Sequence, residues 1–227
     1  MKNNLNVAMK TKWEDLHSEE RFQPKYPNDH VVRFVFSQFP KDLKERSRFK
    51  ILDLGCGAGV HTVFLAKEGF QTYATDISGT GLNVTKKRLQ ENKLTATLKS
   101  ASMENQPFKD NFFDGVISYG VFYYNNSDGY QKAVDETYRV LKRGGRAFIF
   151  TRSTDDYRFG KGKETEKNTF VLDISETNEK DMIMRFLNKG DINKVFSKFE
   201  EIVIEKTETT FDNLKNKNSD WIIMVKK

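Results

Sequence analysis

Ile51-Leu52-Asp53-Leu54-Gly55-Cys56-Gly57-Ala58-Gly59 is the stretch that decides the fold. A short apolar strand pattern runs into three glycines at alternate positions, and apolar residues at helical spacing follow over residues 60–69. A strand that turns through glycines into a helix is how a βαβ unit begins, and ligands bind at this turn in an open α/β sheet. The stretch therefore predicts an α/β fold with a ligand site at the carboxyl end of its first strand.

Strand and helix patterns alternate outward from this loop. Strands are expected over residues 71–76, 95–99, 113–118 and 146–150, and helices over 60–69, 81–92 and 131–141. Such alternation is typical of βαβ units. It predicts a doubly wound, mostly parallel sheet.

The chain after residue 151 has a different pattern. Residues 152–179 are polar apart from a short apolar piece at 169–172; a further strand is expected near 182–187 and a short helix over 191–199. Two strand-like runs, 201–211 and 221–226, follow with a polar turn between them. This ending predicts an antiparallel pair added to the parallel sheet.

Composition narrows the class of protein. The 227 residues are 37% hydrophobic, enough for a large core, and Cys56 is the single cysteine, so neither an internal disulfide nor a metal site is expected. The sequence starts without an apolar targeting segment and has no run as long as a membrane span, which predicts a cytoplasmic protein without a membrane partner. The most basic run, 41–50, also contains acids, which argues against a nucleic-acid partner despite the net charge of +6.

The spacing of the glycines indicates which ligand the loop holds. A dinucleotide fingerprint, G-x-G-x-x-G, would have a third glycine where this chain has Val60. Asp53 stands directly before the loop, where a carboxylate would repel a pyrophosphate but suit an ammonium group. The loop therefore favours a ligand with an amino-acid end over a dinucleotide.

Asp76 ends the second expected strand. A carboxylate at this position can accept hydrogen bonds from the two vicinal hydroxyls of a ribose. An aspartate that caps the following helix is the ordinary alternative, and it stays open. Together with the glycine loop, Asp76 favours a nucleoside-containing ligand.

These features, followed by Pro107-Phe108, Phe113-Asp114, Val140-Leu141-Lys142 and Gly144-Gly145, resemble the class I S-adenosylmethionine (SAM)-dependent methyltransferases over about residues 48–150. The resemblance implies a seven-stranded Rossmann-like sheet, with the last strands as the antiparallel pair, and SAM as the cofactor. It divides the chain into an N-terminal lid or helical segment, 1–47, and a methyltransferase domain, 48–227, with a polar insertion at about 152–185.

The resemblance also implies a set of cofactor-binding residues. They are Asp53, Gly55, Cys56 and Gly57 at the methionine end, Asp76 on the ribose, Ile77, Ser102 and Met103 around the adenine, and Ser118 and Tyr119 beside the sulfonium. Many relatives have aspartate where this chain has Ser102, so the expected contact to the adenine amino group is weakened.

The acceptor side is less defined. We expect the lid to cover the cofactor, with Arg21 or Tyr26 reaching the methionine carboxylate, although a helix packed on the sheet would explain its apolar residues equally well. The polar insertion is expected to recognise the acceptor. Candidates for the group that activates it are Tyr119, Asp155 and Asp156, with the histidines His17, His30 and His61 behind them.

The favoured function is methyl transfer to a small polar metabolite, such as a sugar. After the fourth strand the chain reads Ile117-Ser118-Tyr119-Gly120 and lacks the Asp/Asn-Pro-Pro-aromatic motif of enzymes that methylate base amines. A methyltransferase acting on RNA or protein and a SAM-binding protein without catalysis remain as alternatives.

Overall fold

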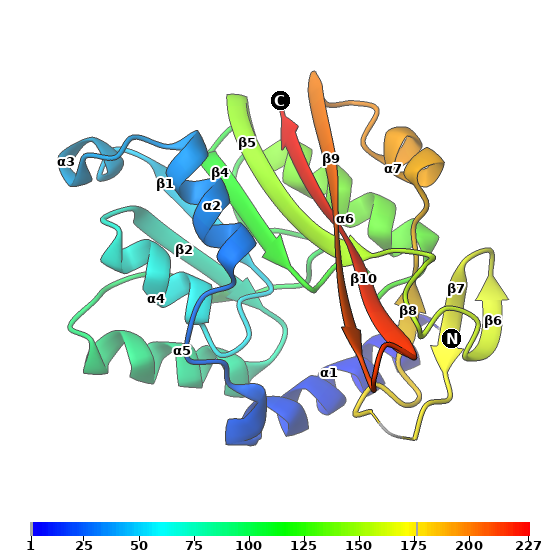
Figure 1. The fold of residues 1–227 in the computed structure, drawn as a ribbon. Coiled ribbons are helices and arrows are strands. Elements are labelled where there is room, and N and C mark those ends of the chain that lie inside the picture. Colours follow the sequence, from blue (N-terminus) through cyan, green and yellow to red (C-terminus); the bar gives the residue numbers. More distant parts are fainter. Residues whose placement is uncertain (1, 176) are drawn as a thin grey trace.

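A seven-stranded sheet with helices on both faces forms the body of the protein in a computed structural model (Figure 1). The structure describes residues 2–175 and 177–227. In the order β3-β2-β1-β4-β5-β10-β9, the strands are β3 (Thr97–Ser100), β2 (Gln71–Asp76), β1 (Lys50–Leu54), β4 (Phe113–Tyr119), β5 (Leu141–Arg152), β10 (Asn216–Lys226) and β9 (Glu201–Phe211). The first five are parallel, and β10 is antiparallel to both β5 and β9. This confirms the expected sheet and its antiparallel ending.

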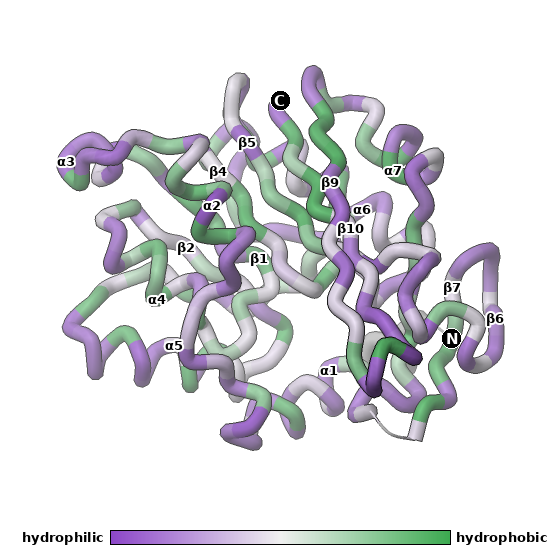
Figure 2. Tube along the Cα trace, viewed as in Figure 1, coloured by the Kyte–Doolittle hydropathy of each residue, from purple (hydrophilic) through white to green (hydrophobic). Residues whose placement is uncertain are grey.

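Helices cover the two faces because the central strands alternate their apolar side chains between them. The helices are α1 (Lys2–Ser18), the short 3-10 helix η1 (Glu20–Phe22), α2 (Asp29–Gln38), α3 (Leu43–Arg46), α4 (Val60–Lys67), α5 (Gly79–Glu91), α6 (Ser127–Val140) and α7 (Lys189–Val195). Ile51 and Ile117 pack in one cluster with residues of α2 and α4, whereas Leu52 and Val116 pack in another with residues of α6 and α7. Hydrophobic stretches accordingly run through the central strands, with paler, more polar residues between them (Figure 2).

The polar insertion folds into a second, smaller sheet. It contains β6 (Gly162–Glu166), β7 (Thr169–Leu172) and β8 (Ile183–Arg185), all antiparallel. Phe170, Leu172, Met184 and Phe186 form its own apolar cluster together with Tyr123 from the segment after β4. The insertion is therefore a packed structure and not an open loop.

Buried ion pairs join the small sheet to the large one. Arg152 at the end of β5 pairs with Asp220 of β10 (2.8 Å) and with Asp156 (3.5 Å). Asp156 also pairs with Arg158, whose Nε donates to Glu179. Because buried charges are tolerated when they are paired, these contacts fix the insertion against the sheet.

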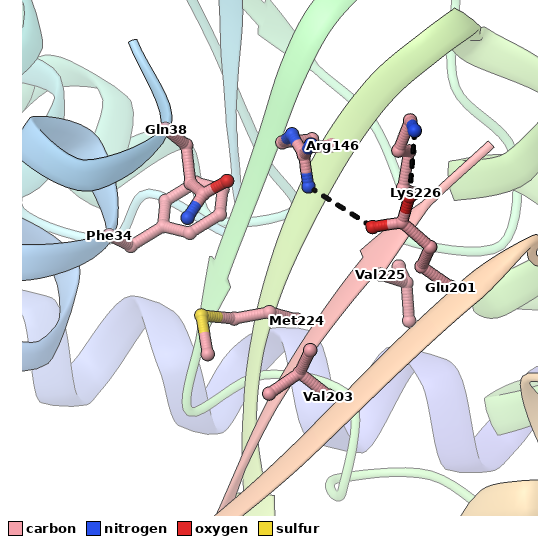
Figure 3. A pocket seen from close by; sticks show the side chains of 8 residues that line it. All are labelled: Phe34, Gln38, Arg146, Glu201, Val203, Met224, Val225 and Lys226. Carbon is pink, nitrogen blue, oxygen red and sulfur yellow. Dashed lines mark hydrogen bonds and ion pairs between the residues drawn. The ribbon is translucent and has the colours of Figure 1, made fainter.

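A small hollow lies away from the glycine loop. A hollow of about 50 Å³ between α2 and the β9–β10 edge, with Glu201 between Arg146 and Lys226, has room for only a few water molecules (Figure 3). It opens at the amino ends of the parallel strands, away from the glycine loop.

Among the helices of residues 2–175 and 177–227, none has the length and apolar character that crossing a membrane requires.

Candidate active site

The glycine loop connects β1 to α4, and its geometry requires glycine. Gly55, Gly57 and Gly59 all have positive φ angles, of 74°, 49° and 76°. A Cβ atom on Gly55 would lie 2.4 Å from a methyl group of Val121, and one on Gly59 would lie 2.4 Å from the Thr85 hydroxyl. The loop is thus folded tightly against its neighbours, so that its backbone can approach a ligand.

Asp76 holds the loop in place. One oxygen of its carboxylate accepts a hydrogen bond from the Gly57 N–H and the other from the Ser78 N–H, both at 2.8 Å. Burial raises the pKa of Asp76, while the two N–H donors and the nearby His17 lower it. A carboxylate has about four acceptor positions, so two remain for the hydroxyls of a ribose.

A cavity of about 890 Å³ opens between this loop and the N-terminal segment. Most of the residues that the resemblance implies for the cofactor line it: Gly55, Cys56, Gly57, Asp76, Ile77, Ser102, Met103 and Tyr119. Ligand cavities range from about 300 to 1,000 Å³. This one has the size for a cofactor together with a small second molecule.

Asp53 and Ser118 lie beneath the cavity wall and not on its surface. The Asp53 carboxylate accepts a hydrogen bond from the Thr62 hydroxyl at 2.6 Å, and burial raises its pKa to about 7. Ser118 is fully buried in β4, and its hydroxyl has no partner among the described residues. Contact of Asp53 with an ammonium group therefore stays a proposal.

The acids of the insertion are engaged away from the cavity. Asp155 pairs with Lys206 at 2.5 Å, and Asp156 belongs to the buried ion pairs described above. Among the described residues of 152–185, Ile183 is the one that lines the cavity. The structure does not bring either aspartate to the expected place of methyl transfer.

The other expected residues, four from the N-terminal segment and His61 from α4, are likewise divided between the cavity wall and places away from it. Tyr26, His17 and His61 line the cavity. Arg21 pairs with Glu19 on the surface, and His30 stacks on the ring of Phe150 with 6.4 Å between ring centroids. Of the two residues proposed for the methionine carboxylate, only Tyr26 faces the cavity.

Helix α1 covers the cavity and is anchored to α5. Figure 1 shows it crossing below the arrowheads of the central strands. The Glu14 carboxylate accepts hydrogen bonds from the N–H groups of Gly79 (2.8 Å) and Thr80 (2.7 Å) and from the Ser78 hydroxyl. Trp13 and His17, which stack on each other, project from α1 into the cavity wall.

Replacing Glu14 by alanine should loosen α1 selectively. Its contacts with Thr80, Gly79 and Ser78 lower the pKa of Glu14 to about 2, so the ionised contact is complete above the ordinary value of 4.5 and is lost as the pH falls towards 2. We expect hydrogen exchange in α1 to become about fivefold faster or more at pH 7, with β4 unchanged. Asp15→Ala, an exposed neighbour on the same helix, is the control; equal exchange in both variants would contradict the anchoring role.

Asn28 links the N-terminal segment to two side chains of the cavity. Its Nδ2 donates to the Tyr119 hydroxyl oxygen (3.0 Å), and its backbone N–H donates to Nε2 of His61 (3.2 Å). Its Oδ1 accepts from the His30 N–H at the start of α2, which fixes the orientation of the amide. Asn28 therefore holds Tyr119 and His61 in one arrangement.

These contacts limit the acid–base chemistry of both partners. Burial lowers the pKa of His61 to about 4, and the Asn28 N–H occupies its Nε2, so the ring is neutral and its lone pair is taken. Burial, with Tyr123 and Asp220 nearby, raises the pKa of Tyr119 to about 12. Tyr119 thus keeps its proton, and since no described residue accepts it, the hydroxyl is available to donate to a ligand.

Asn28→Asp tests this arrangement with a change of one group. Aspartate can still cap α2, but its carboxylate cannot donate to Tyr119. It would instead accept a hydrogen bond from the Tyr119 hydroxyl, whose proton would then point away from the cavity. We expect SAM binding to weaken about 3- to 10-fold, the loss of one neutral hydrogen bond, with little change in the melting temperature. Tyr119→Phe should cause a similar loss, and the double variant no further loss; additive losses would contradict the coupling.

The comparisons with known proteins agree with this geometry. Residues 51–145 match the family model of a methyltransferase domain. A ubiquinone/menaquinone biosynthesis C-methyltransferase, UbiE, of Rhizobium etli is 36% identical over 114 residues, which is 48% of this chain and 43% of that protein. The chain therefore spans less than half the length of that curated relative.

Solved structures share the fold. A SAM-dependent methyltransferase of Methanosarcina mazei superposes with a TM-score of 0.67 at 18% identity, covering 86% of this chain and 96% of the other. TehB of Haemophilus influenzae gives a TM-score of 0.65 at 16% identity, covering 95% and 67%.

Residues 51–145 thus match a methyltransferase domain, and the chain shares its fold with a solved SAM-dependent methyltransferase. SAM is the cofactor that this match indicates, and the residues present fit it. Gly55 and Gly57 of the loop line the cavity, Asp76 has acceptor positions free, and Ile77 and Met103 form apolar walls where the adenine is expected.

Proposed function

We propose that the protein transfers a methyl group from SAM to a small molecule that enters the cavity beneath α1. The observation that carries this proposal is one continuous cavity, which runs from the glycine loop and Asp76 to Tyr119 and the lid. When bound, SAM supplies a methyl group that is already activated on a sulfonium. The protein has mainly to align the two reactants, which can contribute roughly 7–11 kcal/mol to lowering the barrier.

The residues divide this work between them. Asp76 would take the ribose hydroxyls, and Ile77 and Met103 would enclose the adenine. Tyr119, a neutral donor held by Asn28, would hydrogen-bond to the methionine end or to the acceptor. Helix α1, anchored through Glu14, would exclude water from the reacting groups.

The cavity wall supports an acceptor with an apolar part more than a sugar. The sugar hypothesis depended on the polar groups of the insertion, and Asp155 and Asp156 are paired elsewhere. Several apolar and aromatic side chains face the cavity instead, among them Met9, Trp13 and Tyr124. The name of the UbiE relative, a C-methyltransferase of ubiquinone and menaquinone biosynthesis, adds carbon to the candidate acceptor atoms.

The position of α1 over the site also bears on the alternatives. An RNA or a protein substrate needs an open approach to the methyl group, whereas α1 crosses this cavity and is tied down at Glu14. A SAM-binding protein without catalysis would need no room beyond the cofactor. The volume of the cavity therefore favours a small-molecule enzyme.

Calorimetry and a turnover assay test the proposal in sequence. Titration with SAM and S-adenosylhomocysteine should show micromolar binding, and release of S-adenosylhomocysteine should then depend on an added small acceptor. Binding without turnover across an acceptor panel would favour the non-catalytic alternative. Turnover on RNA, with binding that falls steeply as salt is raised, would favour a macromolecular substrate.

A further inference from the structure

One end of the cavity is built from apolar side chains that meet across the lid. Met9 and Trp13 belong to α1, Tyr124 follows β4, and Ile183 lies in β8. All four line the cavity and pack in one cluster, with the rings of Trp13 and Tyr124 edge to face at a centroid distance of 4.9 Å. We call these four residues the apolar subsite.

The sheet order places Tyr124 and Ile183 on the other side of β1 from the residues expected around the adenosine. Asp76 and Ile77 follow β2, and Met103 follows β3, on one side of β1. Tyr124 comes from the segment after β4, on the other side of β1, and Ile183 comes from the insertion that follows β5. The apolar subsite therefore lies towards the β4 and β5 side of the cavity and borders the adenine end, because Asn125, next to Tyr124, donates to Glu104, next to Met103, at 2.6 Å.

Tyr124 lines the cavity with its ring, while its hydroxyl is hydrogen-bonded to another residue. Its hydroxyl donates to one oxygen of Glu179 at 2.9 Å, and the other oxygen of Glu179 accepts from Arg158. The polar atom of Tyr124 is thus taken up by the insertion.

We propose, on the basis of the function proposed above, that the apolar subsite binds a planar, uncharged ring of the methyl acceptor, either aromatic or quinonoid. Trp13 and Tyr124 offer the offset and edge-to-face contacts that aromatic rings prefer. The side chains of Met9 and Ile183 offer no hydrogen bond to a sugar hydroxyl, which would lose its water on entering. A charged ring would likewise lose hydration without gaining a partner.

Calorimetry on the whole chain, saturated with S-adenosylhomocysteine, tests the subsite. The probes are 2-naphthol, its charged counterpart 2-naphthalenesulfonate, and methyl α-glucopyranoside. We expect 2-naphthol to bind at least tenfold more tightly than the other two. Tyr124→Ala should weaken 2-naphthol at least tenfold and change the affinity for S-adenosylhomocysteine less than twofold, while Tyr124→Phe, which keeps the ring, should lose threefold or less.

The outcomes separate this inference from the proposed function. If S-adenosylhomocysteine binds but 2-naphthol does not, or if the glucoside binds as tightly, the apolar subsite is not a ring site and the methyltransferase proposal is untouched. If Tyr124→Ala weakens S-adenosylhomocysteine as much as 2-naphthol, the residue belongs to the cofactor site. If S-adenosylhomocysteine itself fails to bind, the proposed function is overturned first.

Discussion

Asp76→Ala is expected to weaken the binding of SAM and S-adenosylhomocysteine by at least tenfold. The substitution removes the acceptor that we propose for both ribose hydroxyls, and it also frees the Gly57 and Ser78 N–H groups that the carboxylate now holds. Hydrogen bonds to a charged group contribute about 1.5–3 kcal/mol each. Titration calorimetry measures the loss directly.

Two further variants sharpen this result. Asp155→Ala removes a carboxylate that pairs with Lys206 away from the cavity, and it should change cofactor affinity less than twofold. Asp76→Asn keeps one acceptor oxygen and should fall between the wild type and Asp76→Ala. Equal affinities of Asp76→Ala and the wild type would exclude Asp76 from the cofactor site.

Gly55→Ala is expected to abolish measurable cofactor binding and to lower the free energy of unfolding by about 2–6 kcal/mol. It combines strain at a φ of 74° with a Cβ placed 2.4 Å from the side chain of Val121. Strain in such a conformation costs about 1–3 kcal/mol, and overpacking adds about 1–3 kcal/mol. Urea unfolding and calorimetry measure the two effects.

Gly144 offers a matched control for this substitution. It has the same φ of 74°, but nothing lies within 4 Å of a Cβ added there, so Gly144→Ala reports the backbone strain alone. The double variant Gly55→Ala, Val121→Ala should recover part of the lost stability, because the colliding methyl groups are gone. If Gly144→Ala costs as much as Gly55→Ala, packing against Val121 plays no part.

The fold could be predicted from the sequence where the local pattern of apolar residues agrees with their burial in the structure. The apolar run that became β1 and the glycines after it are neighbours in sequence, and Asp76 meets them because β2, the next strand along the chain, pairs directly with β1. β6 was not expected, because Gly162–Glu166 is polar and forms a strand only through pairing with β7. Polar strands of this kind give no periodic apolar signal.

The site was less predictable because its contacts join distant segments. Asn28 and Tyr119 are 91 residues apart, and Glu14 lies 64 residues before Ser78. A polar residue before an apolar helix pattern does signal an N-cap at Asn28, but nothing local signals its contact with Tyr119. The same limit explains why Asp155 was wrongly expected near the acceptor. The sequence shows that the residue is polar, but its ion pair with Lys206 on β9 forms only in the folded sheet.

Strand β9 lies at one edge of the large sheet and pairs only with β10 in the described chain. An open edge of this length invites strands from other molecules to add to it. Val203 exposes 47% of its surface there, yet charged side chains stand along the same strand, with Glu201, Glu205 and Lys206 all exposed. A second copy docking edge to edge would have to bury these charges, so the strand that completes the fold also resists aggregation at high protein concentration.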